Sequence, residues 1–412
     1  MKIQELSTVT LRISRSIVLF LLLVVAVSAS GCGNDSHEGT GIATNLQLVA
    51  TFEGGNLYQA GKFKVLELRG TYKQMGRQYG RLMSSEILAM YDEVVRHFGG
   101  DWGAPSLQDF SMQLFQLYPA RYQELADGIT ETSGIDKNKI AVLSEFFDYV
   151  IKMAGTPFHC SGITAWGDYT GNAPLVMGRD FDFPLTFRNF DQFITVVVYK
   201  PSDGSRPVAI ITYPGQLGSI QSFNDAGLVL ENNDGSSSGD PNRYFGQRVP
   251  FLVNDVEMML HATSLELLDA ALKNSPVHYP LIFNVASPDR AYCYEIATYD
   301  VKRRDGDPSG LVIGVNHFMS PGWPAPPPEK QASIDNSVTR YNNLNLLAER
   351  YKGQINAERM MAILDIPVDQ GGPTPVEYSI YQFVYVPGEL KLWVKALTYS
   401  DWTLIDLKLL FN

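Results

Sequence analysis

The second part of this 412-residue chain is a succession of short, alternating polar and apolar segments separated by tight turns. Such segments predict β-strands, and turns rich in Gly, Asn and Asp predict that neighbouring strands pair as antiparallel hairpins. Three hairpins are expected, at 161–166 with 175–179, 193–199 with 208–213, and 219–224 with 227–232. Further strands are predicted at 280–286, 291–299, 310–316, 379–386, 389–397 and 402–410.

Helical patterns surround these strands. After a strand at 63–68, Thr71 begins a capping box and a helix that ends near His97. On this helix Gly76 and Gly80 lie one turn apart, which favours close packing of another backbone over a phosphate site. Other helices are predicted at 106–154, 250–273, 337–351 and 357–364. Because strands and helices come in separate runs, the chain is predicted to be an α+β protein of stacked sheet and helix layers.

Composition excludes several other classes of protein. Apolar residues make up 45% of the chain and charged residues 19%, which suits a globular protein with a substantial core. The net charge of −11 argues against a nucleic-acid partner, since such proteins normally carry a basic patch. The three cysteines, Cys32, Cys160 and Cys293, are too few for a disulfide scaffold.

The N-terminus has the pattern of an export signal. Basic residues precede the apolar run 17–27, which is too short to span a bilayer comfortably and has the length of a signal-peptide core. The segment 29–32, Ala-Ser-Gly-Cys, resembles a bacterial lipoprotein lipobox, although Leu is commoner than Ala at its first position. The resemblance implies cleavage before Cys32 and lipidation of its thiol and new amine. The alternative is a plain secretory signal followed by a chance cysteine.

This interpretation divides the chain into a signal peptide (1–31), a polar, Gly-containing tether (32–46) and a single domain (47–412). Loss of the leader removes three basic side chains and one acid, so the mature chain has a net charge of −13. Acyl chains on Cys32 would anchor it to a membrane of the bacterial cell envelope. Gly33 follows the cysteine in place of Asp, which favours the outer membrane or cell surface.

Motifs for metal and nucleotide sites are missing from the sequence. The six histidines form neither HExxH nor a zinc spacing, and there is no P-loop or GxGxxG, so no metal or cofactor is predicted. Ser237 lies in a GxSxG match, but it lacks the strand before and the helix after that a nucleophile elbow requires. We therefore predict a flexible surface loop there.

Cys160 opens the first predicted hairpin, and Gly178-Arg179-Asp180-Phe181-Asp182 lies on its second strand. A cysteine that opens a strand, followed by Gly-Arg-x-x-Asp on the next one, resembles the N-terminal nucleophile (Ntn) hydrolases. The resemblance is to their choloylglycine hydrolase, penicillin acyltransferase and acid-ceramidase-like group, which includes autoproteolytic members. Cys160, Arg179 and Asp182 match this pattern residue by residue.

Further matches follow in order along most of the chain, from about 65 to 412. Asn224-Asp-Ala-Gly-Leu228 resembles the family's Asn-x-x-Gly-Leu turn, and the next strand ends at Asn232-Asn233, where the family places an oxyanion-hole Asn. We favour Asn233 and leave Asn232 open. Two later segments also match the family. Segment 314–317 adds Asn316 to the candidate site residues, with Val315 replacing the family's Thr, and segment 337–340 adds Arg340. Upstream, segment 70–80 resembles the glycine-rich opening of autoproteolytic members.

The resemblance implies a four-layer αββα fold of two mainly antiparallel sheets. It also implies a cysteine hydrolase or acyltransferase that acts on a linear amide bond of a small N-acyl conjugate and needs no cofactor. A cut between His159 and Cys160 would divide the domain into 47–159 and 160–412, and the new α-amine, with a reference pKa of about 8, would serve as the base. Asp182 and Arg179 are expected to hold that amine and lower the thiol pKa.

Two other functions remain open at this stage: a phospholipase-B-like lipid ester hydrolase using the same cysteine, and a non-catalytic surface lipoprotein that binds ligands. Cys293 lies on an alternating strand and is predicted to pack in the core, and His317 is predicted to be structural. Aromatic residues near Cys160 fit an apolar acyl pocket or ordinary core; they are Trp166, Phe181, Phe183 and Phe187. The oligomeric state is not predicted.

Overall fold

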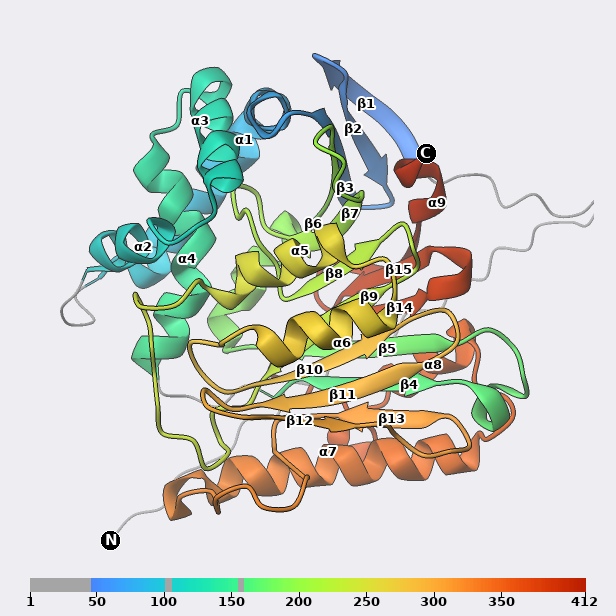
Figure 1. Ribbon diagram of the computed structural model, residues 1–412. Helices are drawn as coiled ribbons and strands as arrows, with labels where there is room; N and C mark the ends of the chain where they lie inside the picture. Colours follow the sequence, from blue (N-terminus) through green and yellow to red (C-terminus); the bar gives the residue numbers. More distant parts are fainter. Residues whose placement is uncertain (1–45, 101–105, 155–158) are drawn as a thin grey trace, which may run out of the picture. The chain divides into compact units, whose positions relative to one another are not determined.

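Two β-sheets lie face to face in the computed structural model, which describes residues 46–100, 106–154 and 159–412 (Figure 1). The larger sheet, sheet A, has the strand order β1-β2-β3-β6-β7-β8-β9-β10-β11-β12. Only the β3–β6 pair of this sheet is parallel within the described residues. Its strands are β1 Leu46–Phe52, β2 Gly55–Ala60, β3 Phe63–Gly70, β6 Thr195–Pro201, β7 Val208–Thr212, β8 Gln221–Asn224, β9 Val229–Asp234, β10 Leu281–Ala286, β11 Ala291–Ile296 and β12 Val301–Arg304.

The second sheet, sheet B, is antiparallel and has the order β13-β4-β5-β14-β15-β16. Its strands are β4 Ser161–Ala165, β5 Val176–Asp182, β13 Leu311–Gly314, β14 Ser379–Val386, β15 Lys391–Ala396 and β16 Ser400–Asp406. The predicted hairpins are therefore present: β4 pairs with β5 in sheet B, and β6–β7 and β8–β9 pair in sheet A.

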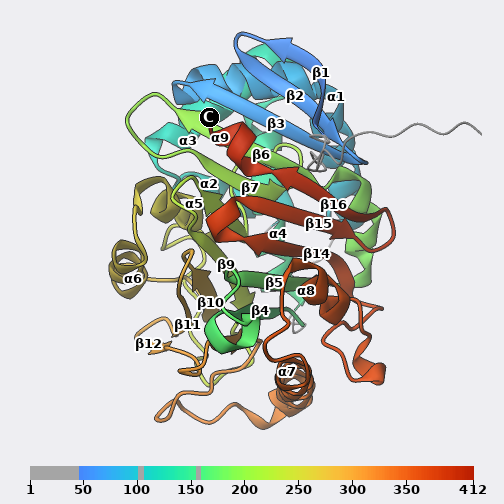
Figure 2. The same ribbon diagram turned by 90° about the vertical axis from the view of Figure 1, so that its right-hand side faces the viewer.

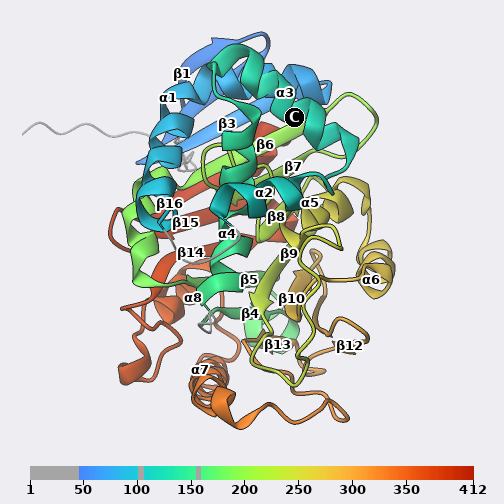
Figure 3. The same ribbon diagram turned by 90° about the vertical axis from the view of Figure 1, so that its left-hand side faces the viewer.

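Helices cover the outer faces of both sheets. Helices α1 and α5 pack on sheet A, and α7 and α8 pack on sheet B (Figure 2). Helices α2, α3 and α4 gather beside α1 (Figure 3). The bounds are α1 Tyr72–Phe98, α2 Leu107–Phe115, α3 Ala120–Ser133, α4 Lys137–Ala154, α5 Phe251–His261, α6 Leu265–Asn274, α7 Gln331–Arg350, α8 Ala357–Leu364 and α9 Leu407–Phe411. The predicted α+β class, with αββα layers, is confirmed.

Central strands carry the core between these layers. Every residue of β5, β9, β10 and β14 is buried, because one side of each strand faces the other sheet and the opposite side faces a helix layer. Polar side chains on these strands, including those near Cys160, are therefore held away from water and must find partners inside the protein.

Several predicted boundaries differ from the structure. The strand predicted at 402–410 ends at Asp406, whose side chain caps α9, so the chain turns helical where the apolar run suggested continued strand. The single helical region at 106–154 is three helices. Strands β1, β2 and β12 were not predicted, since their polar, partly exposed residues give little hydrophobic contrast. Helix α7 begins at Gln331, six residues before the predicted start.

Gly76 and Gly80 on α1 face α3, as close backbone packing requires. A Cβ added at Gly76 would lie 2.1 Å from the Leu125 carbonyl oxygen, and one at Gly80 would lie 2.4 Å from the Ile129 carbonyl oxygen. The two glycines therefore let the helix backbones touch, which confirms the packing interpretation.

None of the helices in the described ranges is both long and apolar enough to cross a membrane. The predicted signal peptide, Cys32 and nearly all of the tether lie outside the described residues.

Replacing Gly76 by Ala is expected to destabilise the protein by about 2 kcal/mol, because the methyl group would overlap the α3 backbone. Urea unfolding measures the change. Gly388→Ala is the matched control, since a Cβ there meets only Pro288 at an ordinary 3.8 Å. Equal unfolding midpoints for the two variants would contradict close α1–α3 packing.

Candidate active site

Cys160 lies directly before β4, between the two sheets. Its side chain is 2% exposed, and its Sγ is 3.7 Å from the Asp182 carbonyl oxygen, to which the thiol donates. The pairing of β4 with β5 explains this position, because Ser161 lies opposite Asp180 and the preceding cysteine therefore meets the end of β5. The predicted Cys–Asp proximity thus follows from the first hairpin.

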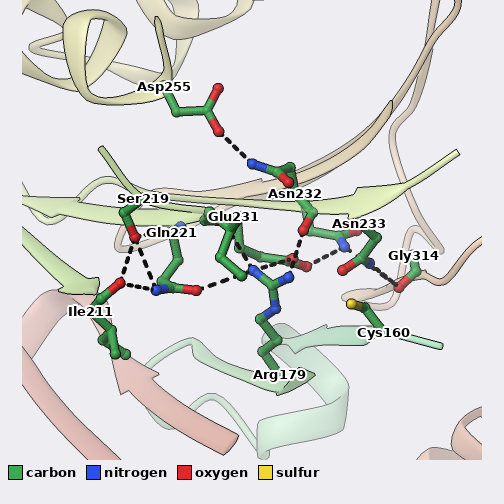
Figure 4. A network of polar contacts seen from close by, with 12 residues as sticks. Cys160, Arg179, Ile211, Ser219, Gln221, Glu231, Asn232, Asn233, Asp255 and Gly314 are labelled. Atoms are coloured by element: carbon green, nitrogen blue, oxygen red, sulfur yellow. Dashed lines mark hydrogen bonds and ion pairs between the residues drawn. The ribbon is translucent and has the colours of Figure 1, made fainter. Parts of the chain in front are cut away.

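Arg179 extends from β5 toward sheet A, beneath the end of β9 (Figure 4). Its guanidinium donates to the carbonyl oxygens of Asn232 at 2.6 Å and Ile220 at 2.9 Å. It also forms an ion pair with Glu231, with 3.1 Å between Nη1 and Oε2. Arg179 is 1% exposed and Glu231 0%, so this ion pair crosses the dry interface between the sheets.

Sequence reasoning missed Glu231 and its partner Asn284, whose amide donates to the same carboxylate. Two glycines of sheet B make room for them. A Cβ at Gly162 would lie 2.2 Å from a Glu231 carboxylate oxygen, and one at Gly314 would lie 2.0 Å from the Asn284 amide oxygen. Both glycines are visible in the sequence, but only the packing of the sheets shows what faces them.

The thiol of Cys160 is held in its neutral form in the continuous chain. Burial raises the pKa of Cys160 to about 12; the nearby Arg179 charge lowers it and Asp182 raises it further. The predicted lowering of the thiol pKa is not found in the uncut chain, because burial outweighs the Arg179 charge and the hydrogen bond to the Asp182 carbonyl group, both of which lower the pKa.

Asn232 and Asn233 point in opposite directions from β9, as successive strand residues do (Figure 4). The Asn232 amide donates to Asp255 on α5 at 2.5 Å. The Asn233 amide points toward sheet B and donates to the Gly314 carbonyl oxygen at 3.1 Å, on the side where Cys160 lies. The direction of the side chain suits Asn233 for the predicted oxyanion role, while Asn232 borders the cavity described below.

Arg340 connects Cys160 with Asn316. This fully buried guanidinium of α7 donates to the Cys160 carbonyl oxygen at 2.5 Å and to the Ser161 hydroxyl at 2.7 Å. It also donates to the Asn316 amide oxygen at 2.9 Å, while the Asn316 amide nitrogen donates to the Asp234 carbonyl oxygen at 2.8 Å. The structure thus brings together the six residues predicted from the sequence: Cys160, Arg179, Asp182, Asn233, Asn316 and Arg340.

A small cavity of about 20 Å³, room for about one water molecule, lies beside the thiol. Its lining combines aromatic and aliphatic side chains with a few polar ones: Phe147, Ile151, Cys160, Arg179, Phe181, Phe183, Ile220, Asn232, Asp234, Phe251 and Tyr279. Of the four aromatic residues noted in the sequence, Phe181 and Phe183 line this cavity, and Phe187 packs on Phe183 at 4.1 Å between ring centroids.

Three residues set aside in the sequence are placed as follows. Ser237 is 1% exposed in a turn directly after β9, so the expected surface loop and the expected lack of a preceding strand are both wrong. The GxSxG match is still no nucleophile elbow, because the next helix begins only at Phe251. His317 contacts the Ser337 hydroxyl at 2.8 Å, and burial lowers the pKa of this histidine to about 4. Cys293 is buried as predicted and also lies 3.0 Å from an Arg304 nitrogen.

Within the described part of the chain, no cluster of three or more His, Cys, Asp or Glu side chains is arranged to hold a metal ion.

Comparisons with known proteins find distant relatives. No protein-family model matches the chain. An uncharacterized protein of Archaeoglobus fulgidus is 22% identical over 403 residues, covering 85% of this chain and 64% of the relative. Protein dcd1A of Dictyostelium discoideum is 27% identical over 203 residues, covering 41% and 45%. The chain thus spans less than two thirds of the length of both curated relatives.

Three solved structures with partial likeness are each below 15% identical to this chain. One is a Caenorhabditis elegans ortholog of N-acylethanolamine-hydrolyzing acid amidase, at 13% identity and TM-score 0.40, covering 56% of this chain and 93% of that one. A variant of conjugated bile acid hydrolase from Clostridium perfringens is 12% identical with a TM-score of 0.41, covering 61% of this chain and 94% of that one. Penicillin V acylase from Agrobacterium tumefaciens is 13% identical with a TM-score of 0.38, covering 60% of this chain and 86% of that one. Likeness of this strength does not establish an activity.

Replacing Glu231 by Gln is expected to lower the thiol pKa of Cys160, because Arg179 would then act on the thiol without its counter-ion. Iodoacetamide labelling across a pH series, located by mass spectrometry, should show a lower midpoint at Cys160. The midpoint at Cys293 should fall as well, because the Glu231 charge also raises the pKa of that thiol. Asp191→Asn removes a different buried carboxyl group and is the control; it should leave both midpoints in place. An unchanged midpoint at Cys160 would show that Glu231 does not balance the Arg179 charge.

Proposed function

We propose that this chain is a cysteine-nucleophile hydrolase or acyltransferase that acts on linear amide bonds of small N-acyl conjugates. The observation that carries the proposal is the arrangement around Cys160. Its thiol lies beside Arg179 and the Asp182 carbonyl group, and its own carbonyl group is held by Arg340. Two guanidinium groups and a buried thiol at the start of one strand make a site in which negative charge can be stabilised.

In the proposed mechanism, the His159–Cys160 bond is cut first and Cys160 gains a free α-amine. That amine accepts the thiol proton, the thiolate attacks the substrate carbonyl, and the amine later protonates the leaving nitrogen. Asn233 and backbone N–H groups stabilise the oxyanion, an effect of roughly 3 kcal/mol per donor. Water then hydrolyses the thioester, or a second amine accepts the acyl group.

The neutral state of the uncut thiol supports this order of events. With the pKa of Cys160 raised to about 12, the uncut chain has little thiolate at neutral pH. An adjacent amine with a reference pKa of about 8 would supply the missing base. No neighbouring histidine is required: burial lowers the pKa of His159 to about 4.

The walls of the cavity beside the thiol, not its size, support an apolar acyl group as the bound part of the substrate: at about 20 Å³ the cavity has to widen before an acyl group enters. Phe147, Phe181 and Phe183 meet at ring-centroid distances of 5.0 to 6.0 Å and form one wall of it. Aromatic and aliphatic walls bind apolar groups by removing their surface from water.

Replacing Cys160 by Ala should leave the chain uncut and lower N-acyl amide hydrolysis by about 10³-fold or more, because the nucleophile is lost. Intact-mass and N-terminal analysis of the mature wild-type protein should show fragments 32–159 and 160–412. Cys293→Ala is the control and should retain cleavage and turnover.

Other outcomes separate the remaining functions. Hydrolysis by Cys160→Ala at the wild-type rate would refute the proposal. Turnover of lipid esters with no turnover of matched amides would indicate a phospholipase-B-like enzyme. A single uncut chain whose Cys160 resists a cysteine-directed electrophile would indicate a ligand-binding lipoprotein.

We further propose that the mature protein is anchored to the bacterial cell envelope through lipid on Cys32. The lipobox-like segment 29–32 and the preceding apolar run support this location. Cys32→Ser should move the protein from the membrane fraction to the soluble fraction and remove a diacylglyceryl mass increment. A membrane-bound Cys32→Ser protein would contradict the lipid anchor.

A further inference from the structure

Asp180 and Asp182 extend from β5 on the face opposite Arg179, since strand side chains alternate. Both carboxyl groups are completely buried. The Ser379 hydroxyl of β14 touches both: it lies 3.1 Å from an Asp180 oxygen and makes a shorter bond to Asp182. A hydroxyl has one hydrogen to donate, so the Ser379 hydroxyl can donate to only one of the two carboxyl groups at a time.

The groups around the pair leave one negative charge unbalanced. Arg340 from α7 is the cation that acts on both carboxyl groups and also on the thiol of Cys160. Gln382 of β14 and Thr374 of the preceding loop are neutral groups that lower the pKa of Asp180. His159 is neutral because burial and Arg340 lower its pKa to about 4. One guanidinium therefore faces two carboxyl groups, and two buried like charges in one site do not ionise together.

We propose that Asp180 and Asp182 share one proton, and that Asp180 is a positioning residue that sets the pH at which Asp182 becomes an anion for the nitrogen of Cys160. The second clause rests on the proposed function. The family motif matches Asp182 alone, so sequence comparison assigns Asp180 and Ser379 no part.

One observation supports the link to Cys160, and another supports the shared proton. Arg340, which holds the Cys160 carbonyl oxygen at 2.5 Å, also acts electrostatically on Asp182, so the pair and the start of β4 share one cation. Burial raises the pKa of Asp180 to about 6, and burial together with the Asp180 charge raises the pKa of Asp182 well above its ordinary value.

The proton balance of self-cleavage fits this pair. Hydrolysis of the His159–Cys160 bond adds OH to the His159 carbonyl carbon and H to the Cys160 nitrogen, which becomes an amine. Transfer of the shared proton to that amine gives an ammonium group, and both carboxyl groups become anions. Within the pair, Arg340 and the ammonium then balance two carboxylates. Return of the shared proton to the pair restores the neutral amine, which is the form that accepts the thiol proton. The new carboxyl group of the partly exposed His159 ionises separately and gives its proton to water.

Carbon-13 NMR titration of the Asp carboxyl groups tests the shared proton without reference to activity. In Asp180→Asn the titration of Asp182 should move to lower pH by about one unit or more, because the neighbouring charge is gone. Ser379→Ala should move the titration of both aspartates to higher pH, since the hydrogen bonds of the Ser379 hydroxyl lower the pKa of Asp180 and of Asp182. Asp191→Asn removes another buried aspartate, with a pKa of about 6, and should leave the pair unchanged.

The link to the reaction is tested by the pH profile of kcat/KM. Its acidic limb should move to lower pH in Asp180→Asn, together with the Asp182 titration, and stay in place in Asp191→Asn. An Asp182 titration that Asp180→Asn does not move would overturn the shared proton. If that titration moves but wild-type protein hydrolyses no amide, the pair stands and its role in the reaction, with the proposed function, is overturned.

Discussion

The buried ion pair between Arg179 and Glu231 is the contact on which the candidate site depends. It joins the central strands of the two sheets, at 3.1 Å, where neither partner reaches water. A buried pair of this kind is costly to form and still more costly to break, because the remaining charge has no solvent. Further hydrogen bonds from Arg179 to the carbonyl groups of Asn232 and Ile220 satisfy the guanidinium. The ion pair thereby ties β5, whose end lies beside Cys160, to β9 of sheet A.

Cys160 lies between two polar layers with different chemistry. On the sheet A side, Arg179 and Glu231 form a charge-balanced pair that moderates the thiol pKa. On the α7 side, Arg340 faces both Asp180 and Asp182, which leaves room for one more positive charge. An α-amine at Cys160 would supply that charge. Before any cut, the Cys160 thiol is therefore neutral. The excess negative charge of Asp180 and Asp182 over Arg340 matches the positive α-amine that a cut before Cys160 would create.

Local patterns predicted much of the fold and part of the site. The hairpin of β4 and β5 was visible as alternation around a turn, and it is what brings Cys160 to Asp182. The strand at 379–386 was predicted with its observed bounds. The end of β16 was not, because a single Asp406 cap decides between strand and helix in a continuous apolar run. Glu231, Asn284 and Ser379 were missed, since nothing local marks a polar residue on a buried strand as a partner of a distant one.

By itself, the sequence determined the α+β class and the paired strands, because alternation, turns and caps act over a few neighbouring residues. The candidate residues of the Cys160 site came from the resemblance of short motifs to those of the Ntn hydrolases. Only the tertiary structure decided which charges meet. The ion pair joins residues 52 positions apart, and the contact of Arg340 with Ser161 joins residues 179 apart. The thiol pKa of Cys160 depends on burial and on those distant charges, which exist only after the sheets have packed.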